Sequence, residues 1–453
     1  MIKFETDSRK VQKGQTFVAI KGHTVDGHDY IDKAIENGAV AVIAEHEVSA
    51  SVPVTVVESS EEFLKENLKK EYADKINNLK IIGITGTNGK TTSCYLTYQL
   101  LSLFEVKVAY MGTIGFKFED IDITLENTTP DILTIYNLFL SAYEKGCTTI
   151  TMEVSSHSLS YERMYGLHID VAAFTNLTED HLDYHKTMEA YLNEKLKIIN
   201  YLPRDGKLIV NIDDEEGHKF IDKFGKAITL GMNGDIKIID FDINPAWTNI
   251  MFIYDGKEYE VKTNLTSKFN VYNYLTAFGI MISLGYNAQD IIDKTKFIKP
   301  PKGRCETHQV NGGYAVIDYA HTPDAVLKVI EAYNELKKNR VITIVGCGGD
   351  RDPIKRPIMG KIAVEQSDFV ILTSDNPRTE DPNKIMSDIL KGVTTDNYQV
   401  ILDRREAIMT GIEMIQPEDI LLILGKGHED YQIIGHTKIH LDDAEEVEKW
   451  KKQ

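Results

Sequence analysis

The clearest pattern in the chain is a run of apolar residues that stops at a glycine-rich turn. The run contains Ile81, Ile82 and Ile84, and it predicts a buried strand because β-branched side chains are favoured there. After the turn, apolar residues recur at helical spacing between Tyr95 and Phe104. The pattern therefore predicts a strand, a tight turn and a helix in immediate succession.

Short apolar runs alternate with helical stretches along the rest of the chain, which predicts an α/β protein. Helices are expected at 30–37 and 61–78. Strands are expected at 16–20, 40–44, 54–57, 108–110, 148–152, 171–175, 208–212, 315–318, 341–345, 369–373 and 420–424. Because helices separate the strands that follow residue 79, we expect a doubly wound, mostly parallel sheet in the middle of the chain.

Two positions predict domain boundaries. The charged helical stretch at 61–78 leads up to the strand that begins near Leu79, and Pro300-Pro301-Lys302-Gly303 has the composition of a linker. We therefore expect three domains, at 1–78, 79–301 and 302–453.

The composition is that of an ordinary globular protein of 453 residues, 42% of them apolar and 26% charged. No apolar run approaches the roughly 18 residues of a membrane span, and the first residues lack the apolar core of a signal peptide. A net charge of −18 argues against non-specific binding to nucleic acid or to a bilayer. The four cysteines lie far apart, which predicts free buried thiols in a reducing compartment. We therefore expect a cytoplasmic protein without nucleic-acid partners or membrane insertion.

The glycine-rich turn predicts a phosphate-binding loop. Its residues are Gly86, Thr87, Asn88, Gly89, Lys90, Thr91 and Thr92. Glycines let backbone N–H groups point at a phosphate, and the N-terminus of the following helix adds positive potential. Lys90 would reach the β- and γ-phosphates, and the Thr91 hydroxyl would contact Mg²⁺. The strict Walker spacing is not met, because Ile84 stands at a glycine position, so a strand-turn-helix without a nucleotide stays open.

Three residues further along the chain are candidates for chemistry. Glu153 ends the apolar run at 148–152, where a parallel sheet would bring a Mg²⁺ ligand beside the phosphate loop. His181 lies in an acidic segment and could bind a metal, although by itself it favours a structural role. Lys195 by itself would be taken for a solvated helix residue.

Eight motifs follow one another in the order found in the Mur ligase family, which this sequence resembles over nearly its whole length. They are G-T-N-G-K-T-T (86–92), N-T-T-P-D (127–131), E-V-S-S-H (153–157), F-T-N-L-T-E-D-H-L-D-Y-H (174–185), G-R-C-E (303–306), D-Y-A-H-T-P-D (318–324), D-N-P-R (375–378) and G-K-G-H-E (425–429). The resemblance implies three domains that bind a UDP-linked substrate, ATP and an amino acid. The middle one would be a doubly wound P-loop domain and the C-terminal one Rossmann-like.

The resemblance also implies the activity, an ATP-dependent amide ligase of peptidoglycan synthesis, and so a role in cell shape, cell division and the cell cycle. ATP would phosphorylate the D-glutamyl carboxylate of UDP-N-acetylmuramoyl-L-Ala-D-Glu, and the amine of meso-diaminopimelate would attack the acyl phosphate. Phosphorylation supplies a leaving group that a carboxylate lacks, so the protein needs cations and positioning groups rather than a covalent nucleophile. The partners would be these small molecules, and the protein would be a monomer.

The resemblance implies four catalytic residues, namely Lys90, Glu153, His181 and Lys195. Thr91 and Glu153 would hold the Mg²⁺ that bridges the phosphates, whereas His181 and Lys195 would hold a second Mg²⁺ near the acceptor carboxylate. Lys195 aligns with the lysine that the family carbamylates with CO₂. A carbamate attracts Mg²⁺, which an ammonium would repel.

Further contacts are implied position by position. Those to the UDP-linked substrate are Ser8, Thr128, Thr129, Ser155, Tyr161 and Arg163, of which Tyr161 stands where relatives often have Gln. Those to ATP beyond the loop are Asn273 for adenine, Arg304 for phosphate and Asp318 for ribose. The T-D-S-R motif begins at Thr6, closer to the start of the chain than in family members, so part of the uridine site is expected to be missing or built differently.

The amino-acid site is implied to contain Arg351, Asp375, Asn376, Pro377, Arg378, Gly425 and Glu429. Arg378 ends the D-N-P-R motif of the members that add meso-diaminopimelate, and lysine-adding relatives lack it. Its guanidinium can bind the distal carboxylate of diaminopimelate bidentately, and lysine has no such carboxylate. Glu429 offers an acceptor for the distal ammonium.

Several alternatives stay open. The same ligase could add L-lysine, or lanthionine, which has the same two ends as diaminopimelate. A folylpolyglutamate synthase is a relative, although the T-D-S-R and D-N-P-R motifs argue against it. A P-loop switch or motor would leave the amino-acid motifs unexplained, and an inactive binding homologue would not need Lys90, Glu153, His181 and Lys195.

Overall fold

The computed structural model describes residues 2–22 and 25–451. The chain divides into two compact units, Met1–Leu230 with Thr276–Tyr286 and Gly231–Leu275 with Asn287–Gln453.

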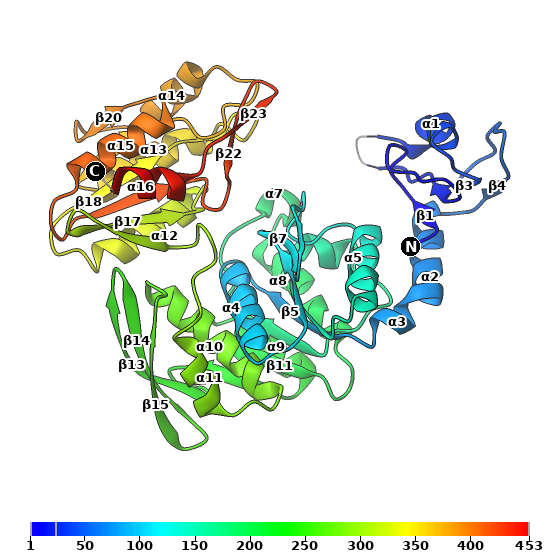
Figure 1. Ribbon diagram of the computed structural model, residues 1–453, viewed down its shortest axis with the longest axis horizontal. Helices are drawn as coiled ribbons and strands as arrows, with labels where there is room; N and C mark the ends of the chain where they lie inside the picture. Colours follow the sequence, from blue (N-terminus) through cyan, green and yellow to red (C-terminus); the bar gives the residue numbers. More distant parts are fainter. Residues whose placement is uncertain (1, 23–24, 452–453) are drawn as a thin grey trace. The chain divides into compact units, whose positions relative to one another are not determined.

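The first unit begins with a small parallel sheet of order β1-β2-β3-β4 (Figure 1). Its strands are β1 (Phe4–Glu5), β2 (Thr16–Val18), β3 (Ala41–Ala44) and β4 (Val54–Val56). The expected helix at 30–37 is a 3-10 turn (Gly27–Tyr30) followed by α1 (Ile31–Glu36). The expected helix at 61–78 is continuous but ends at Ile76, as α2 (Ser60–Leu68), a π-helical turn (Lys69–Ala73) and α3 (Asp74–Ile76).

A larger sheet follows, of order β12-β11-β10-β5-β9-β6-β7-β8, and it is parallel from β12 to β6. Its strands are β5 (Lys80–Thr85), β6 (Val108–Gly112), β7 (Gly115–Phe118), β8 (Ile121–Ile123), β9 (Thr149–Glu153), β10 (Val171–Phe174), β11 (Lys207–Asn211) and β12 (Ile228–Gly231). Its helices are α4 (Lys90–Leu103), α5 (Ile132–Glu144), α6 (Ser156–Ser160), α7 (Leu182–His185), α8 (Met188–Leu196), a 3-10 turn (Lys197–Tyr201) and α9 (Gly217–Phe224). The parallel sheet confirms the sequence prediction.

The register of this sheet aligns the loops that follow its central strands. Ile84 of β5 pairs with Glu153 of β9, and Thr85 pairs with Phe174 of β10. The phosphate loop after β5 is therefore flanked by the loops after β9 and β10. This is the carboxyl edge at which open α/β sheets bind ligands.

The second unit contains an antiparallel meander and a doubly wound sheet. The meander is β13 (Ile236–Asn244), β14 (Trp247–Tyr254) and β15 (Lys257–Thr263). Helix α10 (Lys268–Ser283) then crosses from the second unit into the first along the chain, and α11 (Ala288–Thr295) returns to the second. The meander was not predicted. Charged residues interrupt β13 and β15, and β14 carries an apolar run, Ile250 to Tyr254, for which no strand was expected.

The C-terminal sheet has the order β16-β17-β21-β18-β19-β20, parallel except for β16. The strands are β16 (Glu306–Val310), β17 (Gly313–Asp318), β18 (Val341–Val345), β19 (Phe369–Leu372), β20 (Tyr398–Val400) and β21 (Ile420–Leu424), with a separate hairpin of β22 (Tyr431–Ile434) and β23 (Thr437–His440). The helices are α12 (Pro323–Asn334), α13 (Lys355–Gln366), α14 (Pro382–Leu390), α15 (Arg404–Met414) and α16 (Asp443–Lys451).

The helices cover both faces of the C-terminal sheet. Side chains of α12, α13 and α14 form one apolar cluster with it, and those of α15 and α16 form another. The expected Rossmann-like arrangement is therefore confirmed. All four cysteines are free and buried, as expected. None of the described helices is long and apolar enough to cross a membrane.

Candidate active site

The phosphate loop has the backbone that its glycines predict. Gly86 and Gly89 have φ of 145° and 84°, and a Cβ on Gly86 would lie 1.9 Å from Oγ1 of Thr175. Lys90 curls back over the loop and donates to the carbonyl oxygens of Gly86 and Thr87 at 2.9 and 2.7 Å. Helix α4 begins at Lys90, so its N-terminus points into the loop.

The segment after β10 anchors the loop. The backbone N–H of Thr87 donates to the carbonyl of Asn176 at 2.8 Å, and that of Asn88 donates to its side-chain oxygen at 2.9 Å. The Thr175 hydroxyl donates to the carbonyl of Asn88 at 2.6 Å. Residues 174–177 (F-T-N-L) therefore hold the phosphate loop in place. No such role was predicted for this segment from the sequence.

Glu153 lies beside the first turn of α4, as predicted. Only 1% of it is exposed, and its Oε2 accepts from the Thr91 hydroxyl at 2.8 Å. Its other oxygen accepts from the Tyr110 hydroxyl at 2.6 Å and from the Thr113 N–H at 2.8 Å. The sequence analysis missed Tyr110 and Thr113, because only their position next to the end of β6 brings them to Glu153. The carboxylate and hydroxyl oxygens of Glu153 and Thr91 are of the kind that Mg²⁺ prefers.

Lys195 is buried, contrary to its appearance in the sequence. Its Nζ donates to the carbonyl of Gly86 at 2.7 Å and lies 4.4 Å from the centroid of the Tyr191 ring. Burial, and secondarily the charge of Lys90, hold the pKa of Lys195 well below its usual range. The lysine therefore lies against the phosphate loop in surroundings that favour its neutral amine.

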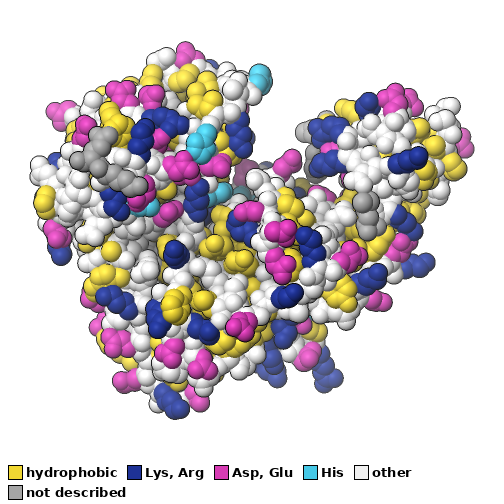
Figure 2. All heavy atoms as spheres, viewed as in Figure 1, with side chains coloured by type: hydrophobic (Ala, Val, Ile, Leu, Met, Phe, Trp, Pro, Cys, Tyr) yellow, Lys and Arg dark blue, Asp and Glu magenta, His cyan; other side chains and the backbone are white. Residues whose placement is uncertain are grey.

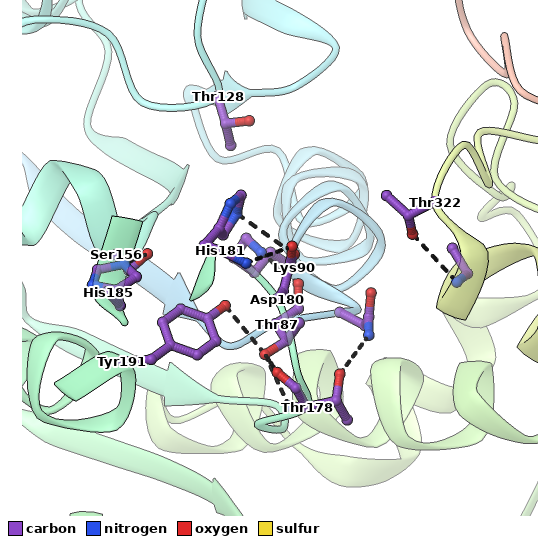
Figure 3. A network of polar contacts seen from close by, with 12 residues as sticks. Thr87, Lys90, Thr128, Ser156, Thr178, Asp180, His181, His185, Tyr191 and Thr322 are labelled. Atoms are coloured by element: carbon purple, nitrogen blue, oxygen red, sulfur yellow. Dashed lines mark hydrogen bonds and ion pairs between the residues drawn. The ribbon is translucent and has the colours of Figure 1, made fainter. Parts of the chain in front are cut away.

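His181 lies at the start of α7 with a φ of 53°, and its ring is 6.2 Å from that of Tyr191 (Figure 3). Its Nε2 is 3.5 Å from a carboxylate oxygen of Asp180. Among residues 2–22 and 25–451, no group of three or more His, Cys, Asp or Glu side chains could hold a metal ion. A metal here would therefore take further ligands from Thr91, a modified Lys195 or the substrates.

Four of the residues expected at the acceptor substrate, namely Thr129, Ser155, Tyr161 and Arg163, are connected in the first unit. The Thr129 hydroxyl donates to the carbonyl of Glu153 at 2.8 Å and accepts from the N–H of Ser155 at 3.1 Å. Arg163 donates to the carbonyl of Thr129 at 2.5 Å, and its guanidinium carbon lies 5.5 Å from the Tyr161 ring centroid.

The other two residues expected at the acceptor substrate, Thr128 and Ser8, lie in different places. The Thr128 hydroxyl is 3.1 Å from that of Thr113. Ser8 lies apart, in the N-terminal sheet region, where its carbonyl accepts from Asn37 at 2.8 Å. The structure therefore brings Thr128 to the residues around Glu153, whereas Ser8 lies in a turn between β1 and β2.

The residues expected to bind ATP beyond the loop lie in the second unit. Asp318, at the end of β17, accepts from the N–H groups of Cys305 and Ala320, both at 2.9 Å, and burial raises its pKa. Arg304 packs its guanidinium carbon 4.8 Å from the Tyr319 ring centroid. Asn273, on α10, donates to the side-chain oxygen of Asn270 at 2.8 Å.

The D-N-P-R and G-K-G-H-E motifs meet at one edge of the C-terminal sheet. Asn376 donates from its side chain to Oε2 of Glu429 at 2.8 Å, and the buried Lys426 donates to the same oxygen at 3.0 Å. A Cβ on Gly425 would lie 2.8 Å from Oδ2 of Asp375, so glycine allows the two loops to approach. Lys426 stood inside a motif that the sequence analysis used, but its burial beneath Glu429 could be seen only in the structure.

The arginines of this edge differ in their surroundings. Arg378 has a φ of 52° and donates to the carbonyl of Gly349 at 2.8 Å, whereas Arg351 is exposed. Arg356, which the sequence analysis missed, is 1% exposed and is paired with Glu380 at 2.7 Å and Asp388 at 3.1 Å. It also donates to the carbonyl of Gly348 at 3.3 Å, so it supports the loop that Arg378 contacts.

A P-loop on a parallel sheet, a buried carboxylate beside it and a second Rossmann-like unit define an α/β nucleotide-binding enzyme. Three family models match the chain, namely the Mur ligase family, catalytic domain (residues 4–82), the Mur ligase middle domain (84–281) and the Mur ligase, glutamate ligase domain (303–427). The chain therefore belongs to the Mur ligase family and is an ATP-dependent amide ligase.

Individual relatives match this chain over nearly its full length. The chain is 40% identical to UDP-N-acetylmuramoyl-L-alanyl-D-glutamate–2,6-diaminopimelate ligase of Clostridium botulinum, covering 98% of this chain and 94% of the relative. It is 42% identical to the ligase of that name from Fusobacterium nucleatum, over 97% and 92%. A solved structure of a ligase with the same name matches with a TM-score of 0.70 and 34% identity, over 99% and 94%. The predicted three-domain fold and the resemblance are confirmed.

Proposed function

We propose that this chain adds meso-diaminopimelate to UDP-N-acetylmuramoyl-L-alanyl-D-glutamate in the cytoplasmic assembly of peptidoglycan. The observation that carries the choice of amino acid is the contact between Asn376 and Glu429, since it joins the D-N-P-R loop to the G-K-G-H-E loop. Arg378 and Glu429 thereby provide one cationic and one anionic group at the same sheet edge. Diaminopimelate carries the complementary pair, a carboxylate and an ammonium, at its distal end.

The first unit would activate the acceptor. Gly86, Thr87, Asn88, Gly89, Lys90, Thr91 and Thr92 would bind the phosphates of ATP. Thr91 and Glu153 would hold Mg²⁺, and their 2.8 Å contact supports this role because both offer oxygen ligands. The ion, when bound, would neutralise charge on the phosphates. Lys90, at the mouth of the loop, would orient the γ-phosphate toward the D-glutamyl carboxylate.

Lys195 would act as a carbamate and, together with His181, hold a second Mg²⁺. The burial of Lys195 and its low pKa support this role, because the neutral amine is the form that adds to CO₂. A carbamate would place two anionic oxygens beside the loop, which suits a metal ligand.

The remaining contacts follow the division into two units. In the first unit, the UDP-linked substrate would be held by Ser8, Thr128, Thr129, Ser155, Tyr161 and Arg163. In the second, Asn273, Arg304 and Asp318 would bind ATP, and Arg351, Asp375, Asn376, Pro377, Arg378, Gly425 and Glu429 would bind the amino acid. We take residues 1–78, 79–301 and 302–453 as the three substrate-binding domains.

The partners would all be small molecules, and the protein would act as a cytoplasmic monomer without nucleic-acid or membrane partners. The net charge of −18 supports the absence of nucleic-acid partners, since a negative protein repels polyanions. On the face drawn in Figure 2, basic and acidic side chains are interspersed.

Phosphate release from ATP tests the proposal. The purified protein would be given UDP-N-acetylmuramoyl-L-Ala-D-Glu with diaminopimelate, with lanthionine, with L-lysine or with no amino acid. We expect turnover with diaminopimelate and background with lysine or with no addition. Equal turnover with lysine would contradict the proposal that Arg378 selects the distal carboxylate of diaminopimelate. Turnover without any amino acid would favour a P-loop switch. Lanthionine turnover equal to that with diaminopimelate would show that the site reads only the distal pair.

A further inference from the structure

Helix α8 presents two side chains, one turn apart, to the phosphate loop. Lys195 donates to the carbonyl of Gly86. The hydroxyl of Tyr191 lies 3.2 Å from Oγ1 of Thr87, toward which it points in Figure 3. Tyr191 is 1% exposed. Because its surroundings are buried, this hydrogen bond is stronger than it would be at the surface, and its loss would cost more free energy. Of the two side chains, the resemblance gave a role only to Lys195.

The hydroxyl of Thr87 contacts both Tyr191 and Thr178. Oγ1 of Thr87 accepts from the N–H of Thr178 at 3.0 Å and lies 3.2 Å from the carbonyl oxygen of the same residue. A threonine hydroxyl has one proton and two acceptor lone pairs. In the contact with Tyr191 either hydroxyl can donate, because the carbonyl of Thr178 and the hydroxyl of Tyr191 lie equally far from Oγ1 of Thr87. In both arrangements a phenylalanine at position 191 removes the hydrogen bond to Thr87.

The ring of Tyr191 is fixed independently of its hydroxyl. It lies 4.4 Å from Nζ of Lys195 and 5.0 Å from the ring of His185, which is tilted by 30°. His185 in turn places Nε2 2.9 Å from the hydroxyl of Ser156, next to the acceptor residue Ser155. Replacing only the hydroxyl should therefore leave the ring, and the groups around it, in place.

We propose that Tyr191 is a positioning residue for the nucleotide loop. Its hydroxyl holds Thr87, and through Thr87 the backbone of the loop, in the shape that receives the phosphates of ATP. The loop needs such support because Gly86 and Gly89 impose little conformational preference of their own. Tyr191 acts through Thr87 and touches no reacting atom. The inference rests on the assignment of residues 86–92 as the ATP loop, but not on the identity of the amino acid or on carbamylation.

The test is Tyr191→Phe, read out as ADP affinity by titration calorimetry and as the separate KM values of the ligase. We expect the ADP Kd and the ATP KM to rise about 3- to 10-fold, the usual effect of one lost buried hydrogen bond. The KM values for the two other substrates should stay unchanged. Tyr136→Phe is the matched control, because Tyr136 is equally buried in the same unit and donates one bond, to the carbonyl of Tyr165 at 2.6 Å.

A double-variant cycle separates positioning from general stability. Thr87→Val removes the hydroxyl that Tyr191 contacts, so adding Tyr191→Phe to it should raise the ADP Kd no further. Thr87→Ser keeps the hydroxyl, so Tyr191→Phe should retain its full effect there, which keeps the test valid if Thr87→Val does not fold. The proposal is overturned if Tyr191→Phe changes ADP affinity no more than Tyr136→Phe, or equally in both Thr87 backgrounds. If the proposed amino acid is wrong, turnover would be absent while the difference in ADP affinity remained.

Discussion

Lys90 and Lys195 donate to the same acceptor, the carbonyl oxygen of Gly86, at 2.9 and 2.7 Å. Burial of Lys195, and secondarily the nearby charge of Lys90, hold the pKa of Lys195 well below its usual range. A carbamate on Lys195 would convert the repulsion between the two lysines into an attraction between opposite charges. The proposed carbamylation would thus remove an unfavourable pairing of like charges.

Activity should therefore depend on CO₂. Ligase turnover in buffer depleted of CO₂ should fall, and added bicarbonate should restore it, because the carbamate forms reversibly on the neutral amine. Lys195→Arg should be inactive under both conditions, since a guanidinium stays charged and does not form the carbamate. Turnover that is independent of CO₂ in the wild type, or substantial in Lys195→Arg, would contradict this role.

Glu153→Gln should lower kcat by on the order of 100-fold and raise the Mg²⁺ concentration needed for half-maximal turnover. The reason is that the carboxylate beside Thr91 loses its charge, whereas its position is kept. Tyr110→Phe is the control, because it removes one hydrogen bond to Glu153 and leaves the charge intact. Equal effects of the two substitutions on the Mg²⁺ requirement would indicate that Glu153 only supports the loop.

Arg378→Lys should raise the KM for diaminopimelate about 10- to 100-fold and leave the KM for ATP unchanged, because a lysine offers no bidentate pair of donors. Arg340→Lys is a matched control in the same unit, where Arg340 binds Asp419 at 2.6 Å as a structural pair. Steady-state kinetics with each substrate varied in turn makes the comparison. An unchanged diaminopimelate KM would remove Arg378 from the amino-acid site.

The pairing of Glu380 with Arg356 predicts a loss of stability in acid. The guanidinium lowers the pKa of Glu380 from 4.5 to about 2 in the folded protein. Because the folded pKa is lower than the unfolded one, this stabilisation is complete above pH 4.5 and is lost as the pH falls toward 2.

Urea unfolding measures that loss. Glu380→Gln should be less stable than the wild type at pH 7, and the difference should shrink between pH 4.5 and pH 2.5. A difference that stays constant over this range would mean that the carboxylate is not ionised through the pair with Arg356.

The sequence predicted those parts of the fold that have continuous apolar runs. The strands at 341–345 and 420–424 match the structure at both ends, because buried parallel strands carry uninterrupted β-branched and aliphatic residues. In the half-buried meander, β13 and β15 escaped prediction because their alternating charged residues resemble those of surface loops, whereas the apolar run of β14 was overlooked.

Some residues of the candidate site could likewise be predicted from the sequence, whereas others could be found only in the structure. Lys90 and Glu153 stood out because a glycine-rich turn and the end of a neighbouring strand are expected to meet at one sheet edge, and the D-N-P-R motif of the family pointed to Arg378. Burial could not be read from the sequence, so Lys195 looked like a solvated lysine and Lys426 received no role. Tyr191 was not noticed either, because its importance depends on a contact with Thr87, 104 residues away along the chain.

The most direct test of the central claim is a competition for one acceptor. The purified protein would receive ATP, Mg²⁺, UDP-N-acetylmuramoyl-L-Ala-D-Glu and equal concentrations of meso-diaminopimelate and L-lysine, with the products identified by mass spectrometry. The account predicts the diaminopimelate adduct and ADP, with the lysine adduct at background. A lysine adduct in equal or greater amount would contradict the assignment of Arg378 and Glu429 to the distal end of diaminopimelate.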